Sequence, residues 1–299
     1  MTIHLGASGG DALSPGLPQP SGTRRPRRML GALPAAVWAS LAVVLVLVLA
    51  ITLPAALGAG DPNATDPLLS LLPPSAEHWF GTDELGRDLY ARVVHGARYS
   101  VVIGVLAVVF AVIVGGALGL LAALGGTVVD EVLSRIFDLL SAFPSILMAL
   151  LFATFFGRGT LNLTLAVGIA IIPAFGRIIR RQALAIRGSD FVTAAVTFGE
   201  SRVRIVLRHV LPNVFTSVLL LAAIEVGVAI LTVSGISFVG LGPERPAPEW
   251  GSLLAEGRSV AAYGWWPTVF PGVSIVVTIL ACTTLGRYLQ RRLERRLVA

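Results

Sequence analysis

One charged stretch interrupts an otherwise apolar chain. Residues 190–213, DFVTAAVTFGESRVRIVLRHVLPN, contain three arginines, one histidine and two carboxylates, while the segments on both sides are apolar enough to lie in a bilayer. These residue types do not form a catalytic set, because the four histidines of the chain are scattered and match no H-E-x-x-H pattern. The chemistry of the stretch is therefore expected to be that of a contact surface.

Nucleotide and metal chemistry are disfavoured by the rest of the sequence. All 23 basic residues are arginine, whereas a Walker phosphate-binding loop requires a lysine that reaches the β- and γ-phosphates. The chain therefore cannot hydrolyse ATP by that route, and we expect it not to be an enzyme. The single cysteine, Cys282, lies in an apolar run, so we expect no metal site and no cofactor bound by this chain.

The composition is that of an integral membrane protein. Of the 299 residues, 55% are hydrophobic and 13% are charged, and the mean hydropathy is +0.81. A soluble domain of this length needs more charge to cover its surface. A bilayer core of about 30 Å requires roughly 20 helical residues. We predict an all-α protein with six transmembrane helices, at 29–60, 99–129, 139–157, 159–176, 210–243 (interrupted by Glu225) and 259–286.

The arginines predict the orientation of these helices. Cytoplasmic segments of membrane proteins are enriched in basic residues, and six crossings place the three arginine-rich segments, 1–28, 177–208 and 287–296, on one side. We therefore expect both termini in the cytoplasm. The predicted order is a disordered basic tail (1–28), the first transmembrane helix (29–60), an external loop with an amphipathic helix (61–98), a five-helix core (99–290) and a second basic tail (291–299). The tails are expected to contact membrane lipid, and no nucleic acid is expected as a partner.

The pattern of the charged stretch predicts two short helices. Asp190 follows a Gly-Ser pair and can cap the free N–H groups of a new helix. Ala194 and Ala195 lie between aromatic residues on one face, a shape suited to close approach by another surface. Gly199 then ends the helix in a left-handed conformation.

A second short helix is expected after that glycine. Glu200 and Arg204 are spaced i, i+4 and can pair, and Pro212 fits the first turn of the next transmembrane helix. The segment is either an amphipathic helix that rests on the membrane, or a rigid projection that receives force from a motor protein. The second explanation suits a membrane chain that cannot bind nucleotide itself.

The same stretch resembles the EAA loop of ABC-transporter permeases, in which E-A-A is followed by three residues, G, a spacer and I-x-x-H-x-L-P. The matching residues are TAA at 193–195, Gly199 and VLRHVLP at 206–212, with threonine where the family most often has glutamate. The resemblance implies the type I ABC importer permease fold and a coupling loop, residues 188–211, that contacts cytoplasmic ATPase subunits. The residues so implied in coupling are Asp190, Thr193, Ala194, Ala195, Gly199, Glu200, Arg204, His209 and Pro212.

Two further segments narrow the family. HWFGTDELGRDLYARVVHGARYSVVIG (78–104) and SFVGLGPERPAPEWGSLLAEGR (237–258) are similar to signatures of the second permease subunit of dipeptide and oligopeptide importers. The resemblance implies a permease that forms half of a path for di- or oligopeptides, although permeases for nickel, glutathione or other small solutes are similar.

The resemblance also implies partners. They are a homologous second permease, two ABC ATPase subunits or one fused ATPase, which use ATP and Mg, and an extracytoplasmic substrate-binding protein. The rival class is a self-sufficient secondary transporter. It is disfavoured because ion coupling requires intramembrane charges, and only Glu225 is available.

Glu225 is the one carboxylate within a predicted transmembrane helix, near mid-bilayer. Its insertion there costs about 2.5–3.5 kcal/mol, so it is expected to face an interior or an aqueous path. Two roles fit this position. The carboxylate lines the path and holds a peptide's amino terminus, or it pairs with an arginine of a partner subunit.

The external loop contains two acid–base pairs at i, i+4 spacing, Asp83 with Arg87 and Asp88 with Arg92. They predict a short amphipathic helix before the second transmembrane helix. This helix either docks a substrate-binding protein or forms a lid that seals the fold. The residues implied in docking are Asp83, Glu84, Arg87 and Asp88.

Prolines and small residues within the predicted helices suggest local packing. Pro144 and Pro173 are expected to kink their helices, and the Gly115-x-x-x-Gly119 pattern is expected to let two helices pack closely.

Overall fold

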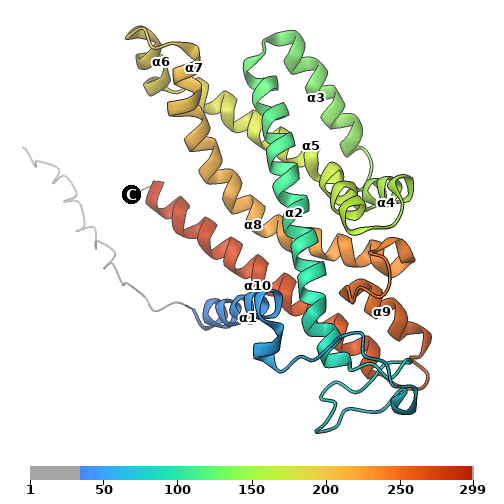
Figure 1. Ribbon diagram of the computed structural model, residues 1–299. Helices are drawn as coiled ribbons and strands as arrows, with labels where there is room; N and C mark the ends of the chain where they lie inside the picture. The colour runs from blue at the N-terminus through green and yellow to red at the C-terminus, as the bar shows by residue number, and fades with distance from the viewer. Residues whose placement is uncertain (1–33, 298–299) are drawn as a thin grey trace, which may run out of the picture. The chain divides into compact units, whose positions relative to one another are not determined.

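The computed structural model describes residues 34–297, which form helices joined by loops (Figure 1). Within this range the only β-type pairing is an isolated bridge between Thr82 and Asp88, so the all-α prediction is confirmed. The predicted tail at 1–28 lies outside the described residues, as do residues 298 and 299. The helices are α1 (Ala35–Thr52), α2 (Leu89–Leu124), α3 (Thr127–Ser141), α4 (Ser145–Phe156), α5 (Thr160–Arg187), α6 (Asp190–Thr197), α7 (Arg202–Ile205), α8 (Leu211–Ile236), α9 (Trp250–Ser259) and α10 (Trp266–Leu297), with 3-10 turns at Pro54–Leu57 and Pro67–Leu69 and π-helical turns at Val206–Val210 and Ser237–Leu241.

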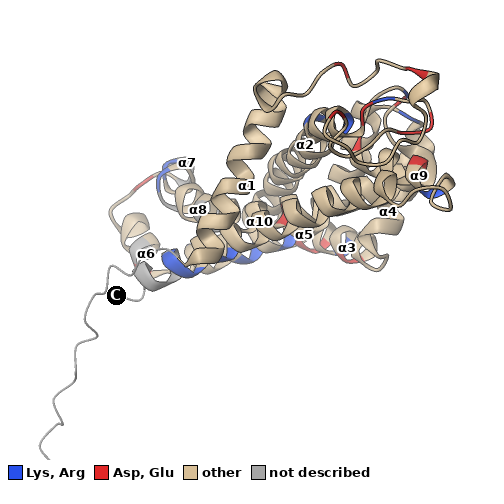
Figure 2. Ribbon diagram, turned by 90° about the horizontal axis from the view of Figure 1, so that it is seen from below, with Lys and Arg blue, Asp and Glu red and all other residues tan. Residues whose placement is uncertain are grey.

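Among the described residues, five helical segments are long and apolar enough to cross a membrane. They are α1, α2, α5, the run Val206–Leu241 that contains α8, and Trp266–Arg292 of α10. Neither α1 nor α4 contains a charged residue (Figure 2). α5 continues as a helix through Pro173.

The crossing predicted at 139–157 is not one straight helix. It consists of the end of α3 and the whole of α4, which meet at 90°, so a sixth crossing exists only if this bent pair counts as one span. The break lies at Pro144, which precedes α4 with an extended backbone (ψ 131°). Proline has no N–H to donate and disfavours the helical conformation of the residue before it. The expected kink is therefore a complete break.

α2 begins earlier than predicted. The Asp88 carboxylate accepts a hydrogen bond from the backbone N–H of Ala91 (2.8 Å) and caps the helix at Leu89. The amphipathic helix predicted in the external loop is thus the first part of α2 itself, and residues 83–87 precede it as a loop.

α2 packs most extensively against α5, and the backbones of the two helices nearly touch. A Cβ atom added at Gly115 would lie 2.7 Å from the carbonyl oxygen of Ile172, and one at Gly119 would lie 2.5 Å from that of Gly176. Only glycine fits such approaches, so the close-packing role predicted for the glycine pair is confirmed. The other helices are arranged around this contact: α4 packs on α5, α8 on α2 and α10, and α9 and α1 on α10.

The glycine contact yields a stability prediction. Gly119→Ala would push the α2 and α5 backbones apart, and overpacking of this kind costs about 1–3 kcal/mol. We expect a lower melting temperature in detergent. The control is Gly60→Ala, because a Cβ atom there meets nothing within 4 Å. Equal melting temperatures for both variants and the parent would contradict the proposed contact.

Candidate functional site

The charged stretch folds as a projection between α5 and α8 (Figure 1). α6 ends in a left-handed glycine, as predicted: Gly199 has φ 78°. The N–H of Glu200 donates to the carbonyl of Ala195 and the N–H of Gly199 to that of Val196, both at 3.0 Å. This pair of bonds is a Schellman motif, which satisfies the last carbonyls of α6 and sets the direction of the chain after it.

The start of α6 differs by one residue from the prediction. Ser189 occupies the capping position, with an extended backbone, and Asp190 lies in the first turn. A carboxylate in the first turn still stabilises the positive end of a helix dipole. Asp190 therefore keeps an electrostatic role without being the cap.

The face predicted to receive a partner is divided. Ala195 is buried together with Val192 in the main hydrophobic core of the chain, so it does not face a partner. Ala194, Val196 and Phe198 are exposed, and the Phe198 side chain is 87% exposed. Periodicity placed the two alanines on one face, but burial in the core removes Ala195 from the exposed part of that face. Ala194 and Phe198, four positions apart, share one exposed apolar face of α6, here called the α6 patch, whereas Val196 is two positions from each of them and lies on another face.

The side chains of Thr193 and His209 fall outside the described residues. Arg204 is exposed, and its predicted pairing with Glu200 stays a prediction. Pro212 lies in the first turn of α8, as predicted.

The second leg of the projection is continuous with α8. α7 leads into the π-helical turn Val206–Val210, where the N–H of Leu211 donates to the carbonyl of Val206. A wider turn of this kind accommodates the proline that follows, which has no N–H. A displacement of α7 would therefore be passed directly to α8.

The end of α5 next to the projection is anchored to two helices. The Arg187 guanidinium donates to the carbonyl of Ala123 in α2 at 3.2 Å. Arg180 forms a bidentate pair with Asp130 of α3, in which the Nη2–Oδ2 distance is 2.6 Å. Such two-point guanidinium–carboxylate contacts have a defined geometry. The projection is thus connected mechanically to α2 and α3 through α5.

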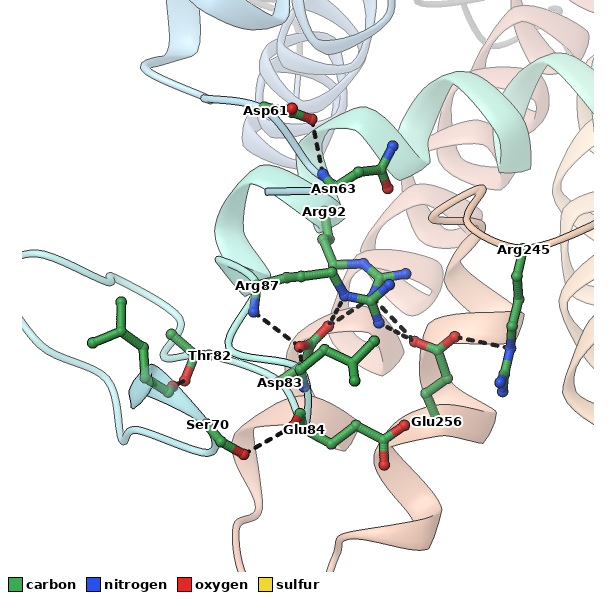
Figure 3. Close-up of polar contacts among 12 residues, drawn as sticks. Asp61, Asn63, Ser70, Thr82, Asp83, Glu84, Arg87, Arg92, Arg245 and Glu256 are labelled. Carbon is green, nitrogen blue, oxygen red and sulfur yellow. Dashed lines mark hydrogen bonds and ion pairs between the residues drawn. The ribbon is translucent and has the colours of Figure 1, made fainter. Parts of the chain in front are cut away.

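A buried network of charged residues lies at the start of α2 (Figure 3). One oxygen of Asp83, Oδ2, accepts from Arg87 Nε at 2.7 Å and from Arg92 Nη1 at 2.6 Å. Glu256 of α9 contacts the same two arginines at 3.3 and 3.2 Å, and Arg245 reaches its other oxygen at 3.4 Å. The network joins the loop before α2 to α9.

This geometry corrects one predicted pair and restricts the docking hypothesis. Asp88 does not pair with Arg92, which is 1% exposed; it caps α2 and contacts His78 Nδ1 at 2.8 Å. Asp83 and Arg87 are buried in the network and are not available for a direct docking contact. Of the four predicted docking residues, Glu84 and Asp88 retain exposed surface.

A second set of contacts fixes α9 to α2. Trp250 donates from Nε1 to the carbonyl of Val93 at 2.8 Å and from its backbone N–H to Ser100 Oγ at 3.0 Å. Ser100 in turn donates to Glu249, whose other oxygen caps α9 by accepting from the N–H of Ser252 at 2.9 Å. Complete burial raises the pKa of the Glu249 carboxyl above its usual range.

The sequence analysis did not identify Glu249, Trp250 or Glu256 as structural residues. One local signal was available, because Glu249 stands three positions before the N–H that it caps. The partners of Glu256 are too distant in sequence for any local pattern.

Glu225 lies in α8 and is half-buried. Among the residues that the structure describes, none forms a hydrogen bond or ion pair with it. A membrane carboxylate without a partner among the described residues is expected to face water, substrate or another subunit. Both roles predicted for Glu225 are compatible with this position.

The Asp83 network predicts the effect of removing one of its buried charges. Asp83→Asn keeps an acceptor oxygen but leaves two buried arginines with one carboxylate, and breaking a buried pair costs about 3–5 kcal/mol. We expect a large fall in melting temperature. Glu131→Gln removes one partner of the exposed Glu131–Arg135 pair, for which about 0–1 kcal/mol is expected. Similar small shifts in both variants would contradict a structural role for the network.

Comparison with known proteins shows which family this chain resembles. Residues 115–299 match the family described as binding-protein-dependent transport system inner membrane component. The dipeptide transport system permease protein DppC of Alkalihalophilus pseudofirmus is 40% identical over 230 residues, 77% of this chain and 76% of that protein. The glutathione transport system permease protein GsiD of Pectobacterium atrosepticum is 37% identical over 224 residues, 75% of this chain and 74% of that protein.

A solved structure agrees with the fold. An inward-facing conformation of the MetNI methionine ABC transporter is similar with a TM-score of 0.57 and 15% identity, over 67% of this chain and 95% of that chain. The type I importer permease fold predicted from the charged stretch is therefore confirmed. The chain belongs to the binding-protein-dependent transport system inner membrane components, the membrane permease subunits of ABC importers.

Proposed function

We propose that this permease forms half of the path of an importer for dipeptides or short oligopeptides. The observation that carries the proposal is the 40% identity to a dipeptide permease over three quarters of both chains. Glutathione is the second candidate, because a glutathione permease is 37% identical over a similar length. In either case ATP hydrolysis belongs to separate ATPase subunits, and this chain is the non-catalytic membrane component.

We propose the following assembly. A homologous permease completes the path, ATPase subunits bind the α6–α7 projection on the cytoplasmic side, and a substrate-binding protein delivers solute on the opposite side. Both chain termini then lie in the cytoplasm, in agreement with the arginine distribution. Glu84 and Asp88 are the docking residues that remain accessible to the binding protein.

The coupling role rests on the shape of the projection. The α6 patch is apolar and exposed, and the Schellman motif at Gly199 fixes its direction. An exposed patch of this kind is typical of a protein interface. ATP-driven movement of a bound ATPase would pass through α6 to α5 and through α7 to α8.

The coupling proposal predicts the effect of charge in the α6 patch. In a reconstituted complex with its partners, Phe198→Asp should lower uptake of labelled Ala-Ala at least about tenfold, a loss of roughly 1.4 kcal/mol, with ATPase subunits bound loosely or hydrolysing without transport. Gly199→Val should act alike, because a β-branched residue is strained at positive φ. Leu68→Asp is the control, since that side chain is 90% exposed but lies outside the projection.

If Phe198→Asp and Gly199→Val both show parental uptake and full ATPase retention, the coupling proposal is contradicted. The projection would then be only a helix on the membrane surface. Uptake of labelled glutathione, measured in the same vesicles, separates the two substrate candidates. If glutathione is taken up and Ala-Ala is not, the dipeptide assignment fails while the permease role stands.

A separate prediction concerns Glu225. If its carboxylate holds the amino terminus of a passing peptide, Glu225→Gln should raise the KM for Ala-Ala and leave assembly of the complex intact. N-acetylated Ala-Ala, which lacks the ammonium group, should be affected less. Unchanged kinetics would remove Glu225 from the path, and loss of the partner permease on purification would indicate an ion pair between subunits instead.

A further inference from the structure

A cavity of about 430 Å³ lies at the end of the helices where the loops 60–63, 157–160 and 243–248 meet. Its volume falls within the range of small-molecule sites. Several of its lining residues belong to the segments 78–104 and 237–258 noted in the sequence analysis, but no role was assigned to them there. Its lining includes His95, Arg98, Gly159, Thr160 and Glu244.

Two opposite charges line this cavity without neutralising each other. Arg98 of α2 and Glu244 of the loop before α9 both have exposed side chains. Among residues 34–297, neither side chain forms a hydrogen bond or ion pair, with each other or with a third residue. Asp83, Arg87, Arg92 and Glu256, by contrast, are paired with one another in the buried network. The cavity therefore keeps one positive and one negative group available.

The positive side of the cavity is reinforced by a helix end. α5 starts at Thr160, and its capping residue, Gly159, has no side chain that could occupy the free N–H groups of the first turn. Unsatisfied N–H groups and the helix dipole attract anions. Arg98 and the start of α5 thus present donors to the same space.

The walls of the cavity are held in place. His95 Nε2 contacts the carbonyl of Gly60 at 3.1 Å and fixes the loop on one side. Pro243, Pro246 and Pro248 restrict the backbone on the other side. A rigid site costs a ligand less ordering entropy.

We propose that this cavity is a binding site for the two charged termini of a dipeptide. The carboxylate would bind Arg98 and the free N–H groups of α5, and the ammonium would bind Glu244. An extended dipeptide spans about 7 Å, so its two charged ends can contact separate groups in one cavity. The inference rests on the proposed peptide function and assigns the entry of the path a preference for zwitterions.

The test is protection of a cysteine at the rim. Thr160→Cys is introduced in a Cys282→Ala background, and the assembled complex without binding protein is alkylated with N-ethylmaleimide in lipid nanodiscs. Ala-Ala should slow alkylation. N-acetyl-Ala-Ala and Ala-Ala-amide should each require about tenfold higher concentration, the loss expected for one charge-assisted contact.

Charge-removing variants assign the two ends. Arg98→Gln should abolish the preference for Ala-Ala over its amide and keep the preference over the acetylated peptide, whereas Glu244→Gln should do the reverse. Arg158→Gln is the control, because this exposed arginine is in the α4–α5 turn but does not line the cavity.

Equal protection by all three peptides, or none, would overturn the inference. Uptake of Ala-Ala by the parental complex with binding protein is measured in parallel. If Ala-Ala is taken up but gives no protection, the site is overturned and the dipeptide function stands. If Ala-Ala is not taken up, the dipeptide function is overturned. Protection by Ala-Ala in the absence of uptake would support the site and overturn the substrate assignment.

Discussion

The contact between the backbones of α2 and α5 is the constraint on which the other features depend. Gly119 approaches the carbonyl of Gly176 so closely that even one added methyl group would clash. Helices in such contact cannot slide independently without large cost, because interiors are close-packed. Since the projection begins where α5 ends, and Arg187 also bonds the end of α2, movement of α6 must carry both helices.

At the opposite end of the molecule, α2 is fixed to α9, so the two helices are expected to move together. Trp250 and Ser100 connect the two elements by direct hydrogen bonds, and Glu256 contacts arginines from the loop and from α2 itself. Burying these charges costs desolvation energy, which paired carboxylates offset only when the geometry is good. The network is therefore better explained by specificity of shape than by stability. It makes the start of α2 and α9 one rigid block, next to the loops that a delivered solute meets first under the proposed orientation.

Much of the fold could be predicted because membrane insertion imposes length and charge limits that are visible in sequence. From those limits the approximate positions of α1, α2, α5, α8 and α10 could be predicted. The bend between α3 and α4 at Pro144 was harder to predict, because a proline in the sequence indicates a kink but not its angle. The pairing of Arg92 was mispredicted because i, i+4 spacing assumes one helix across 83–98, whereas the helix starts only after Asp88.

The candidate site was predicted in outline only. Gly199 could be predicted because few residues other than glycine adopt positive φ at a helix end. The sequence could not predict which of the two alanines is exposed, because periodicity groups residues on one face of a helix but does not show what covers that face. The pairing of Arg87 with Glu256 spans 169 positions and leaves no local trace.

The central claim, that the α6 patch touches the ATPase, is tested most directly by photo-crosslinking. A benzophenone attached to Phe198→Cys in the Cys282→Ala background would be irradiated in the membrane, and adducts would be identified by mass spectrometry, with Leu68→Cys as reference. We predict ATPase adducts from position 198, in an amount that changes when ATP is bound, and none from position 68. Lipid adducts alone from position 198 would contradict the account, because the projection would then rest on the membrane and couple nothing.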